Sequence, residues 1–121
     1  MKRTLTALTV AATMFASSAS AFDPDDLQKL KDTNDCVACY LADARLGVAN
    51  LTEANLMRAN LIGANLTEAN LTWAYLYGTL LNGANLTGAN LNGANLTGTL
   101  LNGAILCNTT MPDGSVIYSG C

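Results

Sequence analysis

The feature that most constrains the fold is a repeat of five residues that runs without a gap through residues 39–111. The unit reads Ala-Asn-Leu-x-x, so leucine occupies every fifth position from Leu41 to Leu106, and Met111 takes the last one. An α-helix turns about 100° per residue, so leucines five apart would spread around its surface. A straight strand would place them on alternate faces. A corner in the chain every five residues gives all of them the same environment.

Each unit therefore predicts a three-residue strand and a two-residue corner. Alanine and leucine would point inward and asparagine outward, and four sides would close a square coil of about 20 residues. Coils stacked ~4.8 Å apart would hydrogen-bond to one another and bury the leucines in a central lumen. Residues 39–111 are long enough for three to four such coils.

The last residue of each unit predicts the turn at the corner. Glycine ends six consecutive units, from Gly78 to Gly103, and it tolerates the positive φ of a type II turn. Among the early units, four end in another residue, which predicts another turn type at their corners: Glu53, Arg58, Glu68 and Trp73.

These units resemble the pentapeptide-repeat family, whose pattern is a small residue, Asp or Asn, Leu or Phe, and two variable positions. The resemblance covers residues 39–111. It implies an all-β fold, a right-handed quadrilateral parallel β-helix. The family includes DNA-mimicking gyrase protectors, exported proteins and members without a known role, so the fold alone implies no activity.

Residues 1–21 are typical of a secretory signal peptide. Lys2 and Arg3 precede an apolar segment, and the small residues 19–21 suit a cleavage site. A membrane anchor is the alternative, but the segment is shorter than the ~20 residues that a span needs. We expect an exported protein, located in the periplasm, the extracellular space or the thylakoid lumen.

Short segments flank the repeat and are predicted to cover its two ends. Residues 22–38 hold a short helix, with Asp23 as its N-cap and Pro24 in its first turn, followed by a Cys-x-x-Cys segment. Residues 112–121 form a C-terminal cap with a turn at Pro112 and a brief apolar strand. A solenoid needs such caps because its terminal coils expose core and backbone edges.

Four cysteines lie near the two ends of the repeat: Cys36, Cys39, Cys107 and Cys121. An even number in an exported chain suggests disulfides, and three pairings are possible. Local pairing, Cys36 with Cys39 and Cys107 with Cys121, is favoured because several coils separate the two groups. Cys39 fills a small-residue core position and is alternatively a buried thiol. The Cys-x-x-Cys start and the cysteine-containing end resemble exported pentapeptide-repeat proteins of cyanobacteria and related bacteria.

The chain offers little for catalysis. It has no histidine, the usual general base, and residues 49–111 contain three charged side chains, Glu53, Arg58 and Glu68. Tyr40 follows Cys39 where haem attachment needs histidine. We therefore expect no enzyme activity, no cofactor and no metal site.

The hypothesis that remains is an exported, non-catalytic structural or protein-binding module, with an unknown protein partner or with self-association. The alternative is a gyrase-binding DNA mimic. The export signal and a repeat that carries asparagine instead of aspartate weigh against nucleic-acid-related roles. A threonine-based ice-binding face is also weak, because Asn, Gly and Cys interrupt the columns of threonines at positions 20 apart. After signal cleavage no membrane association is expected.

One group of outward positions departs from the Asn, Thr and Gly that dominate the walls. We name it the aromatic strip, and it comprises Trp73, Tyr75, Tyr77, Leu80 and Leu100. Exposed Trp and Tyr often anchor partners, which makes the strip a possible binding site. The other interpretation is structural: the two leucines would stack on each other, and the aromatic rings would cover a loose corner or lie under the tail.

Overall fold

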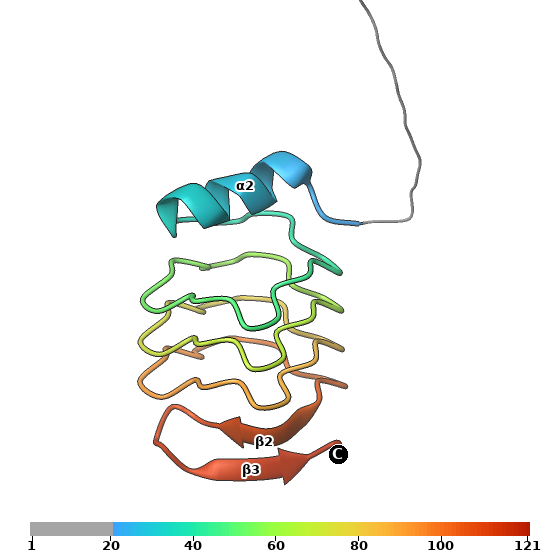
Figure 1. The fold of residues 1–121 in the computed structure, drawn as a ribbon, viewed down its shortest axis with the longest axis vertical. Coiled ribbons are helices and arrows are strands. Elements are labelled where there is room, and N and C mark those ends of the chain that lie inside the picture. Colours follow the sequence, from blue (N-terminus) through green and yellow to red (C-terminus); the bar gives the residue numbers. More distant parts are fainter. Residues whose placement is uncertain (1–20) are drawn as a thin grey trace, which may run out of the picture.

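The computed structural model describes residues 21–121, so the predicted signal peptide lies outside the described residues except for Ala21. The regular elements stand at the two ends of a stack of coils (Figure 1). Helix α2 (Pro24–Thr33) lies at one end, and strands β2 (Leu106–Thr110) and β3 (Val116–Ser119) lie at the other.

Parallel β-bridges between positions 20 apart define the coils. Four ladders begin at Asp35, Tyr40, Arg45 and Asn50, and each ladder contains three bridges. Backbone hydrogen bonds connect each side to the next coil: Asn85 N–H donates to the carbonyl of Ala64 at 2.9 Å, and Leu66 N–H donates to the carbonyl of Asn85 at 2.8 Å. The chain is therefore a solenoid in which one turn takes 20 residues.

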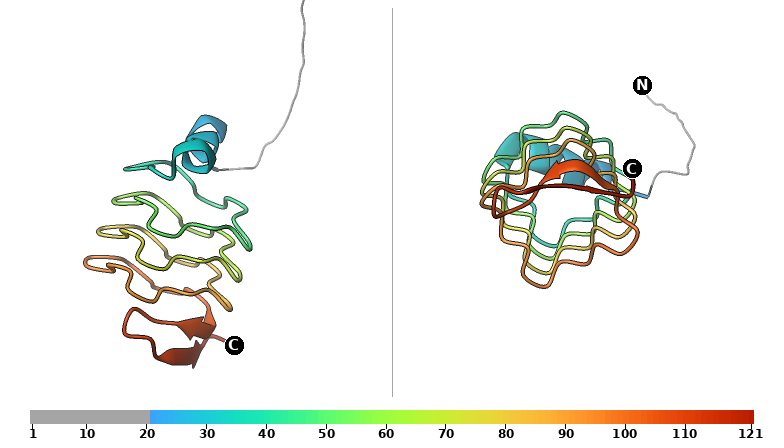
Figure 2. Two further views of the ribbon diagram at one scale, coloured as in Figure 1. Left: turned by 60° about the vertical axis from the view of Figure 1, so that its left-hand side comes forward. Right: turned by 90° about the horizontal axis from the view of Figure 1, so that it is seen from below.

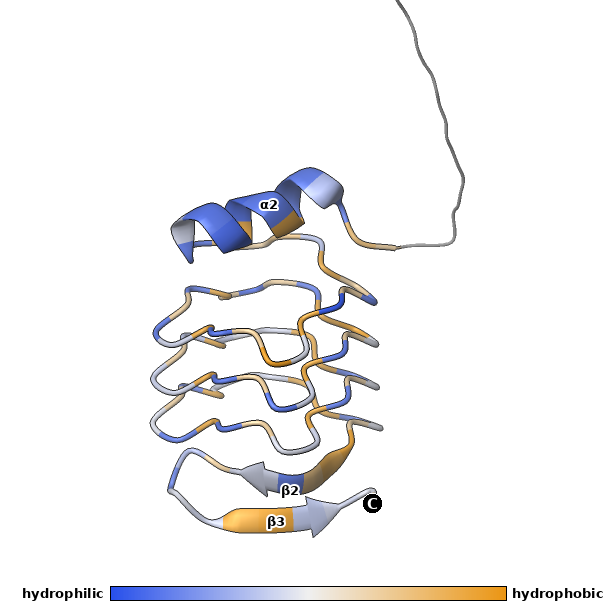
Figure 3. Ribbon diagram, in the orientation of Figure 1, coloured by the Kyte–Doolittle hydropathy of each residue, from blue (hydrophilic) through white to orange (hydrophobic). Residues whose placement is uncertain are grey.

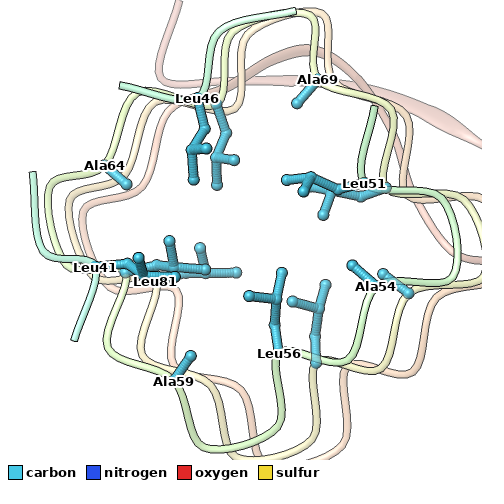
Figure 4. Close-up of a cluster of buried hydrophobic side chains, with 14 of the residues drawn as sticks. Leu41, Leu46, Leu51, Ala54, Leu56, Ala59, Ala64, Ala69 and Leu81 are labelled. Atoms are coloured by element: carbon cyan, nitrogen blue, oxygen red, sulfur yellow. The ribbon is translucent and has the colours of Figure 1, made fainter. Parts of the chain in front are cut away.

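The repeated leucines and alanines point into the lumen (Figure 4). Every repeat leucine from Leu41 to Leu91 is buried. The large inward side chains of the last coil are only partly buried, because no further coil covers them; they are Leu96, Leu101, Leu106 and Met111. The core is thus fully buried along most of the solenoid and only partly buried at its C-terminal end.

The prediction of a different turn type at the early corners is wrong. Trp73, which stands at one of them, has a φ of 59°, against 66–75° at the glycine corners. The other early corners share this left-handed conformation: Glu53, Arg58 and Glu68. The ladder explains it, because the N–H of each corner residue donates to the next coil, as that of Trp73 does to the carbonyl of Asn92 at 3.0 Å. Surrounding bonds of this kind hold a residue in a conformation that only glycine favours by itself.

Helix α2 lies across the N-terminal end with its few apolar residues toward the coils (Figure 3). Asp23 caps the helix by accepting from Asp25 N–H at 2.8 Å, as the sequence predicts, and Pro24 begins it. Leu30 is buried in the core. Asp23 N–H donates to the carbonyl of Tyr40 at 2.8 Å, which fixes the start of the helix to the first coil.

Strands β2 and β3 form an antiparallel hairpin that crosses the other end of the solenoid (Figure 2). Two ladders of the wall end here: Asn90 bridges Thr110, the last residue of β2, and Asn85 bridges Ile105, the residue directly before β2. Strand β3 pairs with β2 alone in this two-stranded sheet, so its outer edge has no partner among residues 21–121.

Candidate interaction surfaces

The asparagine at the centre of eight of the sides has a structural role that sequence reasoning missed. Its Oδ1 accepts a hydrogen bond from the N–H two residues ahead, as Asn85 does from Thr87 at 3.0 Å. The same bond forms at seven more units, whose asparagines are Asn50, Asn55, Asn60, Asn65, Asn70, Asn90 and Asn95. This local bond is the Asx-turn, and the recurrence of Asn one residue before leucine and the corner was the available signal. The wall is therefore lined with neutral amides that hold its corners.

Threonine at inward positions fills the place of alanine and adds a bond between coils. Thr79 Oγ1 donates to the carbonyl of Leu56 at 2.7 Å, and Thr109 Oγ1 donates to that of Leu86 at the same distance. Both side chains are buried, so each hydroxyl needs such an acceptor.

The structure places most of the aromatic strip on the surface. Trp73 is 61% exposed and Tyr75 is 51% exposed, and Tyr77 and Leu100 are also exposed. Leu80 is half-buried and bridges Leu100 on the next coil. The strip thus brings three exposed aromatic rings and a leucine pair onto neighbouring sides of the solenoid.

Two members of the strip contact the wall itself. The ring of Trp73 lies flat over Gly93 on the next coil, because an ideal Cβ at Gly93 would come within 2.6 Å of Cδ2 and Cζ3 of the indole. Arg58 lies over the ring of Tyr77, with 5.9 Å from its guanidinium carbon to the ring centroid. One face of each of these rings is therefore occupied by the solenoid.

The four cysteines form two disulfides, one near each end. Cys36 bonds to Cys39 with an S–S distance of 2.06 Å, and Cys107 bonds to Cys121 with 2.01 Å. Cys36 and Cys39 are both buried beneath α2, within the hydrophobic core. The second bridge joins β2 to the residues that follow β3, so it closes the hairpin.

A groove of about 630 Å³ opens between the end of α2 and the first coil, and nothing in the sequence analysis predicted it. Its walls are residues 30–34 of the helix end and residues 45–52 of the coil. Leu30, Leu46 and Leu51 form its apolar floor, and the exposed side chains of Lys31 and Arg45 stand on its rim. The groove depends on where α2 crosses the coil, which a local pattern does not encode.

The C-terminal hairpin offers exposed apolar side chains and one acidic group. Val116 is 45% exposed and Tyr118 is 67% exposed on β3. In the turn before β3, Asp113 accepts from the hydroxyl of Ser115 at 2.6 Å and from its N–H at 2.9 Å. These two bonds hold the pKa of the Asp113 carboxyl below its ordinary value, and the bond from the hydroxyl has the larger effect. The group is therefore ionised near neutral pH.

Neither a metal centre nor a membrane span is found in the described part of the chain. Across residues 21–121, no three His, Cys, Asp or Glu side chains are grouped so that they could hold a metal ion. The same residues include no helix with the length and apolar character that crossing a bilayer requires.

Comparisons with known proteins agree with the repeat. The family model described as pentapeptide repeats, in 8 copies, matches residues 35–72 and 69–108. A solved pentapeptide repeat protein from Nostoc PCC 7120 is 30% identical, with 76% of this chain and 82% of that chain covered and a TM-score of 0.45.

A pentapeptide repeat protein from the thylakoid lumen of Arabidopsis thaliana is 29% identical, with 69% of this chain covered and a TM-score of 0.43. This chain spans 65% of that protein's length. No curated protein matches the sequence significantly. Because the family model covers more than half of the residues, the chain belongs to the pentapeptide-repeat family, whose fold is a right-handed β-helix solenoid.

Proposed function

We propose that the protein is exported and non-catalytic, and that its solenoid of three to four coils, capped at one end by α2, is a structural or protein-binding module. The sequence of residues 1–21 supports export through its charged start, apolar segment and small-residue end. Two disulfides support it as well, because such bonds persist in oxidising compartments.

The observation that carries the binding role is the exposure of the aromatic strip. Trp73, Tyr75 and Tyr77 stand on a wall that mostly presents asparagine, threonine and glycine. Trp and Tyr dominate the energetics of protein interfaces because they bury a large area at little conformational cost. The contact of Trp73 with Gly93 holds its ring flat against the wall, so the opposite face is presented to a partner in a fixed orientation.

The test compares wild type with the double variant Trp73→Ala, Tyr75→Ser. Affinity capture from an extract of the compartment in which the protein resides should recover a partner with wild type and lose it with the variant. Tyr40→Ser is the matched control, since Tyr40 is also an exposed tyrosine, at 46%, but lies outside the strip. Trp73 is the single tryptophan, so its fluorescence should change when the captured partner is added back.

Thermal melting distinguishes the structural interpretation of the strip. If the double variant melts at a lower temperature while capture persists unchanged, the strip only supports the wall and the binding role fails. If capture is lost and the melting temperature is close to that of wild type, the strip is a binding surface.

A further inference from the structure

The groove beside α2 contains an unpaired backbone edge. Arg45 and Asn50 begin two of the four ladders, and within residues 21–121 their N–H and C=O groups make no hydrogen bond toward the N-terminal side. The start of α2 bonds to Tyr40 on another side of this coil, and the Asn34 side chain at its end donates to the carbonyl of Thr52, at the corner after Asn50. An unpaired edge of this type is a template for another strand.

Strand β3 lies at the opposite end of the same two ladders. The ladder of Arg45 ends at Ile105, directly before β2, and the ladder of Asn50 ends at Thr110, the last residue of β2. Strand β3 pairs with β2 and leaves its outer edge unpaired. If a second copy is placed along the solenoid axis, the outer edge of β3 in the first copy therefore faces the unpaired edge at Arg45 and Asn50 in the second.

Side chains at the two places are chemically complementary. Strand β3 exposes Val116 and Tyr118, and the groove has an apolar floor. The groove rim carries Lys31 and Arg45, with Asp32 beside them. The hairpin carries ionised Asp113, and residues 106–121 contain no basic side chain.

We propose that the C-terminal hairpin of one copy docks in the N-terminal groove of a second copy, so that β3 adds to the edge at Arg45 and Asn50 and the copies associate head to tail. Tyr118 is the anchor in the groove, and the rim cations Lys31 and Arg45 attract the acidic hairpin of the other copy. A contact of this type is heterologous, so it leaves a free groove and a free hairpin at the two ends of every assembly.

Charge favours this arrangement over the pairing of two like ends. Two hairpins brought together would oppose two Asp113 carboxylates without a nearby cation, because residues 106–121 contain no Lys or Arg. The association uses the ends of the solenoid and not the aromatic strip, so it can fail while the proposed function stands, and the reverse also holds.

The experiment uses two blocked variants of the full chain and sedimentation velocity at rising concentration. Arg45→Glu blocks the groove, since it turns a rim cation into an anion. Val116→Ser with Tyr118→Ser blocks the hairpin, since it removes both exposed apolar side chains of β3. All three positions are exposed, and circular dichroism with thermal melting verifies that each variant is folded.

Wild type should form species whose size rises with concentration, and each blocked variant alone should associate at least tenfold more weakly. An equimolar mixture of the two variants should form a dimer and nothing larger, because one intact hairpin meets one intact groove. Ile62→Ser, which removes an exposed apolar side chain of the wall outside the aromatic strip, should associate as wild type does.

Three results would overturn the proposal. Wild type that stays monomeric at every concentration shows that the ends do not associate. Dimers of the groove-blocked variant alone show that hairpins pair with hairpins. Loss of association in Ile62→Ser, with both blocked variants unaffected, moves the contact to the wall.

Discussion

The contact between Trp73 and Gly93 makes one glycine of the wall different from the others. An alanine at position 93 would place its Cβ against the indole, whereas an alanine at position 83 would meet nothing within 4 Å. Both residues have a positive φ, of 75° and 68°, so the conformational cost of the alanine, about 1 kcal/mol, is shared. Gly93→Ala should therefore lower the melting temperature more than Gly83→Ala does.

A double-mutant cycle with Trp73→Ala isolates this contact. The added cost at position 93 should disappear in the Trp73→Ala background, because the two residues touch. Equal losses in both backgrounds would mean that the indole does not rest on Gly93.

The alternation of inward and outward residues gives a second prediction. Leu86 is fully buried in the lumen, so Leu86→Asp should prevent folding by burying an unpaired charge. Asn85→Asp should stay within about 0.5 kcal/mol of wild type, because an aspartate oxygen can also accept from Thr87 N–H. Circular dichroism and thermal melts compare the two, and similar melts would contradict the assignment of the two faces.

Features that follow from the five-residue period were predicted from the sequence, and features that depend on bonds between coils or within a side were not. The buried leucines follow from a strict period that only a repeated corner explains. The corners at Glu53 and Trp73 differ from the prediction because bonds to the next coil hold both residues at a positive φ without a glycine. The hydrogen bond made by each central asparagine depends on its side-chain oxygen, whereas the period of the repeat indicates only the direction of the side chain.

The two terminal elements differ in how they are tied to the solenoid. Helix α2 is fixed by Leu30 in the core and by the bonds of Asp23 and Asp26 to Tyr40. The hairpin covers inward residues that are only partly buried, and its disulfide closes a loop with a sequence separation of 14. The hairpin is therefore the more weakly packed element, and it depends more on its covalent bond.

Reduction of the disulfides should loosen the hairpin first. A loop of about 15 residues corresponds to roughly 3 kcal/mol in the chain-entropy account of disulfide stabilisation. Hydrogen exchange after reduction should rise in residues 106–121 and stay low in the middle coils. The variant Cys107→Ser, Cys121→Ser should show the same pattern without a reductant.

Peptide mapping without reduction is the companion measurement. It should recover Cys36 linked to Cys39 and Cys107 linked to Cys121. A link between the two groups would be incompatible with the stack, because several coils lie between them. Free thiols in the exported protein would contradict the bridges themselves.

At the scale of the whole molecule, the sequence indicates a stack with a cap at each end. It does not indicate the groove and the unpaired backbone edges that these caps leave exposed. The groove arises because α2 crosses the first coil without pairing with Arg45 and Asn50. The unpaired edge of β3 likewise follows from the direction in which the chain returns after Met111. Both are properties of the assembled ends, which no five-residue pattern contains.

The predicted signal peptide can be tested on protein recovered from the native host. Its intact mass should correspond to a chain that begins at Phe22. Cleavage after Ala21 is compatible with the fold, because among residues 21–121 Phe22 is the first that packs against the core. A cytoplasmic chain that still begins at Met1 would contradict export.

Each side of the solenoid pairs with the side 20 residues away in the sequence. This pairing also restricts how the length of such a chain can change during evolution. A duplication or deletion of 20 residues adds or removes one whole coil and leaves α2 and the hairpin over the same sides. An insertion of five residues keeps the repeat intact but turns the hairpin by a quarter of a coil relative to α2. Viable length variants of this protein are therefore expected to differ in steps of whole coils between their ends.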